Sequence, residues 1–99
     1  MNGVMGLFSI FDVKAEAFMR PFCAPTKAFA IRMIQDMMRN PEEMVAKYPQ
    51  DYALFWVGEF DEQGGVITPQ HLSLGSFIEF RAQLEGEVLE KGKAIDAVA

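Results

Sequence analysis

The sequence predicts an α+β fold: a small, mostly antiparallel β-sheet with one principal helix packed on one face, plus short helices. Two observations predict it. Residues 4–11 and 52–60 are rich in aromatic and branched apolar residues, and each is followed by a polar turn. Residues 27–39 instead repeat apolar side chains at helical spacing. Because the chain has 99 residues, we expect a single domain over 1–86 and a frayed tail at 87–99.

A β-hairpin is predicted at the start of the chain. Residues 4–11 form the first strand, and Asp12 opens a polar turn through an Asx-turn. Residues 17–23 return as the second strand. Pro21 cannot donate a ladder hydrogen bond, so this strand is expected to lie at a sheet edge or to end there with a kink.

The principal helix is expected over residues 27–39. Pro25 holds the residue before it in an extended conformation, and Thr26 can then cap the helix. At 3.6 residues per turn the side chains divide into two faces. The core-facing side is expected to carry Ala30, Met33, Ile34, Met37 and Met38, and the solvent side Arg32, Gln35, Asp36 and Arg39.

A short second helix is predicted over residues 41–47. Asn40 can cap it, Pro41 suits the first helical position, and Glu43 can close a capping box.

The second half of the chain is expected to return to the sheet. A strand over 52–60 is followed by a turn at 61–65 and by a return strand that begins at 66–68. Ser76 with Glu79 forms a further capping box, which predicts a C-terminal helix from about 77 to 85.

Both faces of the predicted sheet are apolar. Tyr52, Leu54, Trp56 and Phe60 would share one face, and Ala53, Phe55 and Val57 the other. One helix covers about one face, so the second face needs the C-terminal helix, a partner chain or both. We therefore expect a homodimer, whose candidate interface residues are Phe8, Ile10, Phe55, Trp56 and Val57.

Composition excludes several classes of protein. The formal net charge is −5, but residues 1–39 hold five basic against three acidic residues, and residues 40–99 four against eleven. An acidic chain is a poor candidate for strong nonspecific DNA binding. No apolar run reaches the roughly 20 residues of a membrane helix, and no signal peptide is recognisable. A single cysteine excludes an internal disulfide, which fits a reducing cytoplasm.

The basic residues of the first half are the candidate nucleic-acid contacts. They are Arg20, Lys27, Arg32 and Arg39, with Lys14 nearby. In this interpretation they contact phosphates, while an exposed aromatic residue such as Trp56 or Tyr52 stacks on bases. The alternative is an ordinary solvated helix face, on which Arg32 pairs with Asp36.

Enzymatic chemistry has little support in the sequence. Cys23 and His71 are the only residues of their kinds, and no third group that would orient them can be identified. Asp61 and Glu62 lack the spacing of a calcium loop and indicate a turn. We therefore predict no catalytic residue, no metal site and no cofactor. His71 is expected in a solvated loop.

The order of several short segments resembles a known family. The segments are "FSIFDVKAEAFMRPFCAPTKAFAIRMIQDMM" and "YPQDYALFWVGEFDEQGGVI", within residues 7–67. They resemble the small nonstructural protein of gokushoviruses, which are tailless single-stranded DNA phages of the microvirus group. The resemblance implies a role in viral DNA replication and packaging within the host cytoplasm, and it brings no catalytic residues.

Together these observations predict a non-enzymatic phage protein that binds single-stranded DNA or replication and procapsid proteins. The alternative is a dimeric interaction module that regulates a phage or host enzyme without DNA contact. A small hydrolase that uses Cys23 is a third and weaker interpretation.

Overall fold

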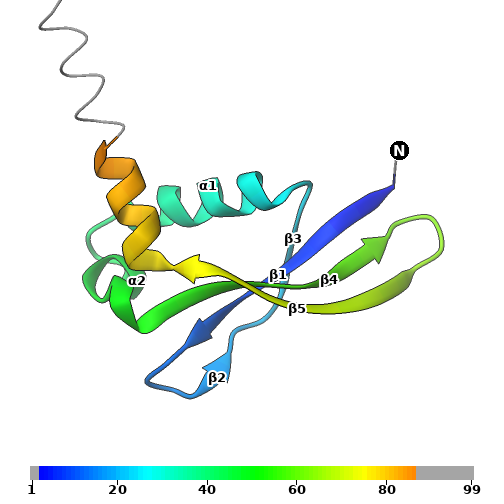
Figure 1. Ribbon diagram of the computed structural model, residues 1–99, viewed down its shortest axis with the longest axis horizontal. Helices are drawn as coiled ribbons and strands as arrows, with labels where there is room; N and C mark the ends of the chain where they lie inside the picture. Colours follow the sequence, from blue (N-terminus) through cyan, green and yellow to red (C-terminus); the bar gives the residue numbers. More distant parts are fainter. Residues whose placement is uncertain (1–2, 87–99) are drawn as a thin grey trace, which may run out of the picture.

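A computed structural model describes residues 3–86 and confirms the α+β class (Figure 1). The predicted tail at 87–99 lies outside these residues. In chain order the elements are β1 (Val4–Asp12), β2 (Ala17–Phe18), β3 (Phe22–Ala24), α1 (Lys27–Met38), α2 (Met44–Lys47), the 3-10 turn η1 (Pro49–Asp51), β4 (Tyr52–Asp61) and β5 (Val66–Ser76). Residues 77–86 are helical and are called the C-terminal helix below.

The sheet is antiparallel, with the strand order β2-β1-β4-β5, and β3 also pairs with β1. Because β4 follows β1 along its whole length, β2 and β3 share the other edge of β1. They are two pieces of one edge strand, interrupted at residues 19–21. This confirms the edge position that Pro21 predicted. Across the interruption, the Ser9 hydroxyl donates to the Met19 carbonyl at 2.6 Å.

Helix α1 begins as predicted. The Thr26 hydroxyl accepts a hydrogen bond from the Phe29 amide at 3.1 Å, which satisfies one of the free donors of the first turn. The buried stripe is Ala30, Ile34 and Met38. Met33 and Met37 were expected in the core, but each is 38% exposed.

The buried side of α1 also includes part of Gln35, whose side chain was expected to face solvent. The Gln35 side-chain amide donates to the Phe80 carbonyl of the C-terminal helix at 3.2 Å, and the contact is partly buried. The methionines are exposed and Gln35 faces inward because the C-terminal helix packs beside α1 as well as over the sheet (Figure 1).

The second helix is shorter than predicted. It starts at Met44, with no side-chain hydrogen bond at its cap, instead of at Pro41. Asn40 instead caps the turn between α1 and α2, because its side-chain oxygen accepts a hydrogen bond from the Glu42 amide at 3.0 Å. The capping signal at Asn40 therefore stabilises a turn before α2 and does not start the helix.

The core lies between the sheet and the helices. Its largest fully buried side chains are Phe8, Ile34, Leu54, Phe77 and Phe80. Gly6 gives Phe8 its place, because a β-carbon there would come within 2.5 Å of the Phe8 ring. Phe8 and Ile10, which were candidate interface residues, are only 1% and 5% exposed, so they are held within the chain's own core.

All helices of the described residues lie on the same side of the sheet. The C-terminal helix begins at Phe77 after a Ser76 cap, in which the Ser76 hydroxyl accepts from the Ile78 amide at 3.3 Å. Its Arg81 guanidinium donates to the Ala46 carbonyl of α2 at 2.8 Å. The C-terminal helix therefore packs with α1 and α2 and leaves the opposite face of the sheet without helical cover (Figure 1).

A β-bulge at Val57 divides strand β4. Leu7 is opposite Gly58 while Phe8 is opposite Trp56, so Val57 is an extra residue on β4. Beyond the bulge the alternation of faces is reversed. Phe60, opposite Met5, thus lies on the other face from Trp56, and the prediction that both share one face was wrong.

Truncation of Ile34 tests the assignment of the core. We expect Ile34→Ala to lower the free energy of unfolding by about 2–5 kcal/mol, because the side chain is 1% exposed. Met33→Ala is the matched control on the next residue, which is 38% exposed, and a much smaller loss is expected. Urea denaturation measures both. Equal losses would contradict this orientation of α1.

Candidate functional site

The face of the sheet away from the helices is the candidate site, and we call it the open face. Strand pairing places on it residues that alternate with those of the core. The larger ones are Met5, Leu7, Phe11, Phe18, Cys23, Phe55, Val57, Phe60, Ile67 and His71. None of these is acidic, lysine or arginine, although 23% of the chain is charged.

Four rings form a continuous cluster on the open face. The centroids of Phe11 and Phe18 lie 4.8 Å apart, and those of Phe18 and Phe55 lie 5.1 Å apart. His71 extends the cluster, at 5.0 Å from Phe55 and 6.1 Å from Phe18. The rings come from β1, β2, β4 and β5, so the cluster crosses the sheet from one edge to the other.

Fold and register explain how these rings meet. The hairpin places Phe11 directly opposite Phe18, and β1–β4 pairing places Ser9 opposite Phe55. Ser9 is small, which leaves a hollow of about 320 Å³ beside the rings, lined also by Met19, Pro21 and Gln70. Phe18 remains 44% exposed. The cluster is therefore an accessible aromatic surface with a hollow at one side.

Accessible rings on a β-sheet can stack on the bases of single-stranded nucleic acid. Stacking accepts any base and needs no charge on the aromatic surface itself. Such a surface can equally be buried against an apolar face of another protein. The arrangement is thus suited to binding.

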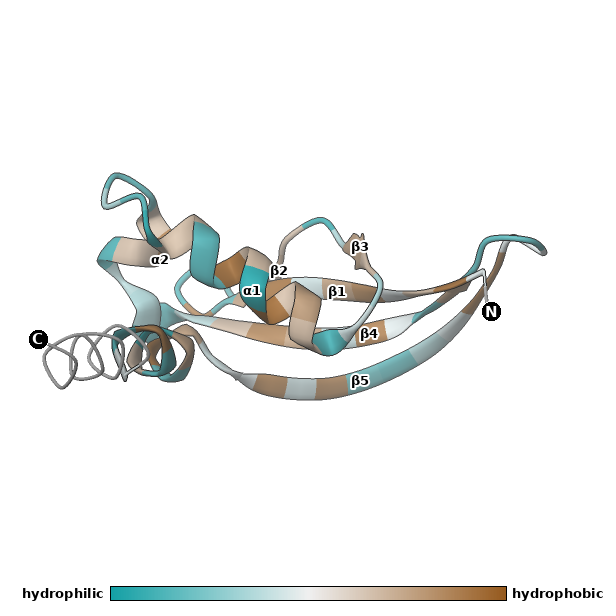
Figure 2. Ribbon diagram, turned by 90° about the horizontal axis from the view of Figure 1, so that it is seen from above, coloured by the Kyte–Doolittle hydropathy of each residue, from teal (hydrophilic) through white to brown (hydrophobic). Residues whose placement is uncertain are grey.

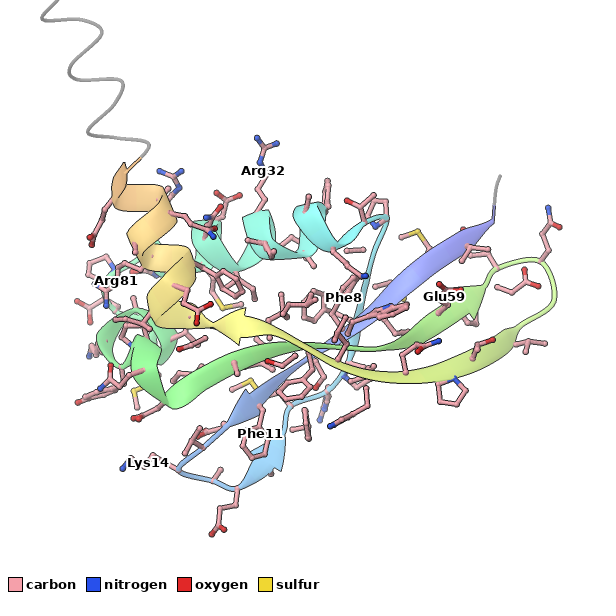
Figure 3. The ribbon with its side chains drawn as sticks, in the orientation of Figure 1. Phe8, Phe11, Lys14, Arg32, Glu59 and Arg81 are labelled. Atoms are coloured by element: carbon pink, nitrogen blue, oxygen red, sulfur yellow. The ribbon has the colours of Figure 1, made fainter. Side chains whose placement is uncertain are left out.

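The predicted basic residues do not form one stripe. Lys27 lies over the Trp56 ring, with its ammonium 4.4 Å from the ring centroid, on the helix side of the sheet. Arg32 extends from α1 away from the sheet (Figure 3). Arg39 pairs with Asp36 at 3.3 Å, so the alternative pairing of Arg32 with Asp36 is replaced by this one.

Lys14 and Arg20 are the two predicted cations that lie at the edge of the sheet with β2. Lys14 lies in the β1–β2 turn, below the sheet with Phe11 (Figure 3). Arg20 lies between Met19 and Pro21, which both line the hollow. The fold therefore leaves two of the five predicted cations on the segment that also carries Phe18.

Neither aromatic residue that was expected to stack on bases is freely available. Tyr52 is 6% exposed, in contact with Phe77. Burial, with the nearby carboxylates of Asp12 and Asp51, raises the pKa of its phenol. Trp56 is half-buried beneath Lys27.

A second hollow, of about 440 Å³, lies on the helix side beside Trp56 and the start of α1. Glu59 lines it together with Lys27, so its charges are of both signs. A carboxylate at this position opposes phosphate binding. The helix-side hollow is therefore the weaker candidate for a nucleic-acid site.

Cys23 and His71 are far apart. Cys23 is on β3 and His71 on β5, and both β1 and β4 lie between them. Three strand spacings of about 4.8 Å separate the two residues by roughly 14 Å. A nucleophile–base pair needs hydrogen-bond contact, so this geometry does not support the hydrolase interpretation. Within residues 3–86, no three potential ligands are grouped around a metal position.

Phe11, Phe18 and His71 are the site residues that sequence reasoning missed. His71 lies in β5 and not in a loop, because an edge strand can accommodate Pro69 two residues earlier. Phe18 could have been found from the hairpin, since a four-residue turn after Asp12 places it opposite Phe11.

Among residues 3–86, no helix is long and apolar enough to cross a membrane. A family model described as phage ORF5 protein matches residues 5–80 of the chain. No curated protein and no solved structure gives a match.

Tyr52 offers a test of burial at the core side of β4. Its phenol has a raised pKa in the folded state, so the unfolded chain releases this proton more readily. The stability that this shift contributes is fully present below the usual tyrosine pKa of about 10, and it is lost as the pH rises through the pKa of the folded state. We expect Tyr52→Phe to remove part of this alkaline loss, measured by urea denaturation from pH 8 to 11. Tyr48→Phe is the control, since Tyr48 is 45% exposed. An equal effect of both variants would contradict the assignment.

Proposed function

The chain belongs to the phage ORF5 protein family, and from this premise we propose that it is a non-enzymatic protein that binds single-stranded DNA during replication or packaging of a phage genome. The open face is the proposed contact surface. The resemblance to gokushovirus nonstructural proteins supports the genome type, and it supports the host cytoplasm as the place of action.

The observation that carries the proposal is the aromatic cluster on the open face. Phe11, Phe18, Phe55 and His71 form a surface that no described helix covers. Base stacking on an aromatic side chain contributes about 1–3 kcal/mol per base. The rings extend across four strands, so a strand of DNA lying across the sheet has several rings available to it.

The charges on the chain set the character of this binding. Lys14 and Arg20 are the candidate phosphate contacts, while the chain as a whole carries −5. Each contact with a single strand contributes about −0.7 to the slope of log affinity against log salt, so two contribute about −1.4. We therefore propose binding in which stacking dominates and salt has a modest effect.

A second candidate function is supported by the overall charge. An acidic chain with an uncharged apolar face is suited to a protein partner, such as a phage replication or procapsid protein, or an enzyme that it regulates. In this case the open face contacts protein and no DNA.

Fluorescence anisotropy with a labelled oligothymidylate tests the stacking surface. We expect Phe18→Ala to weaken binding by about 5- to 100-fold, because a stacking partner is lost. Phe29→Ala is the matched control: Phe29 is 47% exposed on α1, against 44% for Phe18, and its loss is expected to leave the Kd unchanged. Absence of binding at low salt would overturn the proposal and favour the protein partner.

The salt dependence tests the location of the phosphate contacts. Lys14→Ala with Arg20→Ala is expected to flatten the slope of log affinity against log salt by about 1.4, since both contacts are removed. Arg32→Ala with Arg39→Ala removes the same charge from the helix side and is expected to leave the slope unchanged. The reverse pattern would move the DNA from the open face to α1.

A further inference from the structure

Strand β5 is a long edge strand that lacks the charged residues with which many natural edge strands are protected. It spans eleven residues, Val66–Ser76, and pairs with β4 on one side only. No strand of the described residues lies on its other side, and Figure 2 shows β5 along the border of the sheet. Natural edge strands are commonly blocked by charged residues, but residues 66–76 contain no acidic residue, lysine or arginine.

The opposite edge of the sheet is blocked. There β2 has two residues and β3 has three, and residues 19–21, which include Pro21, separate them. Short, interrupted edges with proline do not accept a further strand. The two edges therefore differ in their capacity for pairing, and of the two only β5 is a long, continuous edge strand.

The side chains of β5 also favour contact. Leu72 is 46% exposed, and its neighbours Gln70, His71 and Ser73 are exposed as well. Pro69 lacks an amide donor, so pairing is best placed after it, where residues 70–74 contain neither proline nor charge. Leu72 is at the centre of this segment.

We propose that β5 pairs antiparallel with β5 of a second copy of this chain, about a two-fold axis within residues 70–74. Near such an axis each residue meets its own equivalent, so a charged residue would be opposed by the same charge. An uncharged segment is what this contact requires. Two chains of net charge −5 repel one another elsewhere, which favours contact where charge is absent.

Pairing through β5 would join the two open faces. His71 ends the aromatic cluster at β5, so the two clusters would meet at the axis, on one sheet that continues from β5 of one copy into β5 of the other. The site proposed for DNA would then be continuous across the dimer. Dimerisation itself does not depend on DNA binding.

Sedimentation equilibrium between 1 and 100 µM tests the contact. The expected mass is twice the 11.1 kDa of the chain. Leu72→Lys places like charges beside the axis and is expected to give the mass of a single chain. Val13→Lys is the control, since Val13 is 49% exposed and lies in the β1–β2 turn, away from β5. This variant is expected to remain a dimer. Circular dichroism checks that both variants are folded.

Cysteine mapping locates the axis. In a Cys23→Ser background, single cysteines at positions 70–74 are oxidised, and the strongest self-crosslink is expected at one position within the segment, with weaker products on either side. A single-chain mass at 100 µM would overturn the proposal. So would a dimer that survives Leu72→Lys but is lost in Phe18→Lys, because the open faces would then be the contact.

Discussion

The sheet is apolar on both faces, while the helices of the described residues cover only one, and the rest of the structure depends on this inequality. On the covered side, α1, α2 and the C-terminal helix enclose Phe8, Leu54, Phe77 and Phe80. On the other side, the aromatic rings shield one another instead of entering a core. Burial of apolar area is the main source of folding stability, so a face left accessible indicates a contact made with something else.

Because only one face is covered, the residues that stabilise the fold and those of the proposed binding surface lie on opposite faces of the sheet. Helix-side substitutions such as Ile34→Ala act on the core, whereas Phe18 on the open face is largely free of core contacts. The two edges of the sheet differ as well, because Pro21 and short strands block one edge, whereas β5 is long and uncharged at the other. The proposed binding surface and the proposed pairing edge thus adjoin at His71, which belongs to both.

Charge has a smaller part than the sequence indicated. The five candidate cations are near one another in sequence, but α1 carries Lys27, Arg32 and Arg39 to the side away from the open face. Lys14 and Arg20 lie on the segment that also carries Phe18. Binding to an acidic chain of this kind has to come mainly from stacking or apolar contact, which salt screens little.

Local signals in the sequence determined the fold class, the Thr26 cap of α1, the edge position of the segment with Pro21, and the strand at residues 52–60. These depend on hydrogen bonding and dihedral limits within a few residues. Tertiary structure decided which side of each element is buried. Packing of the C-terminal helix beside α1 turned Gln35 inward and left Met33 exposed, and the bulge at Val57 moved Phe60 to the other face. The aromatic cluster is likewise tertiary, because register across four strands brings its rings together, and periodicity within one segment carries no information about register.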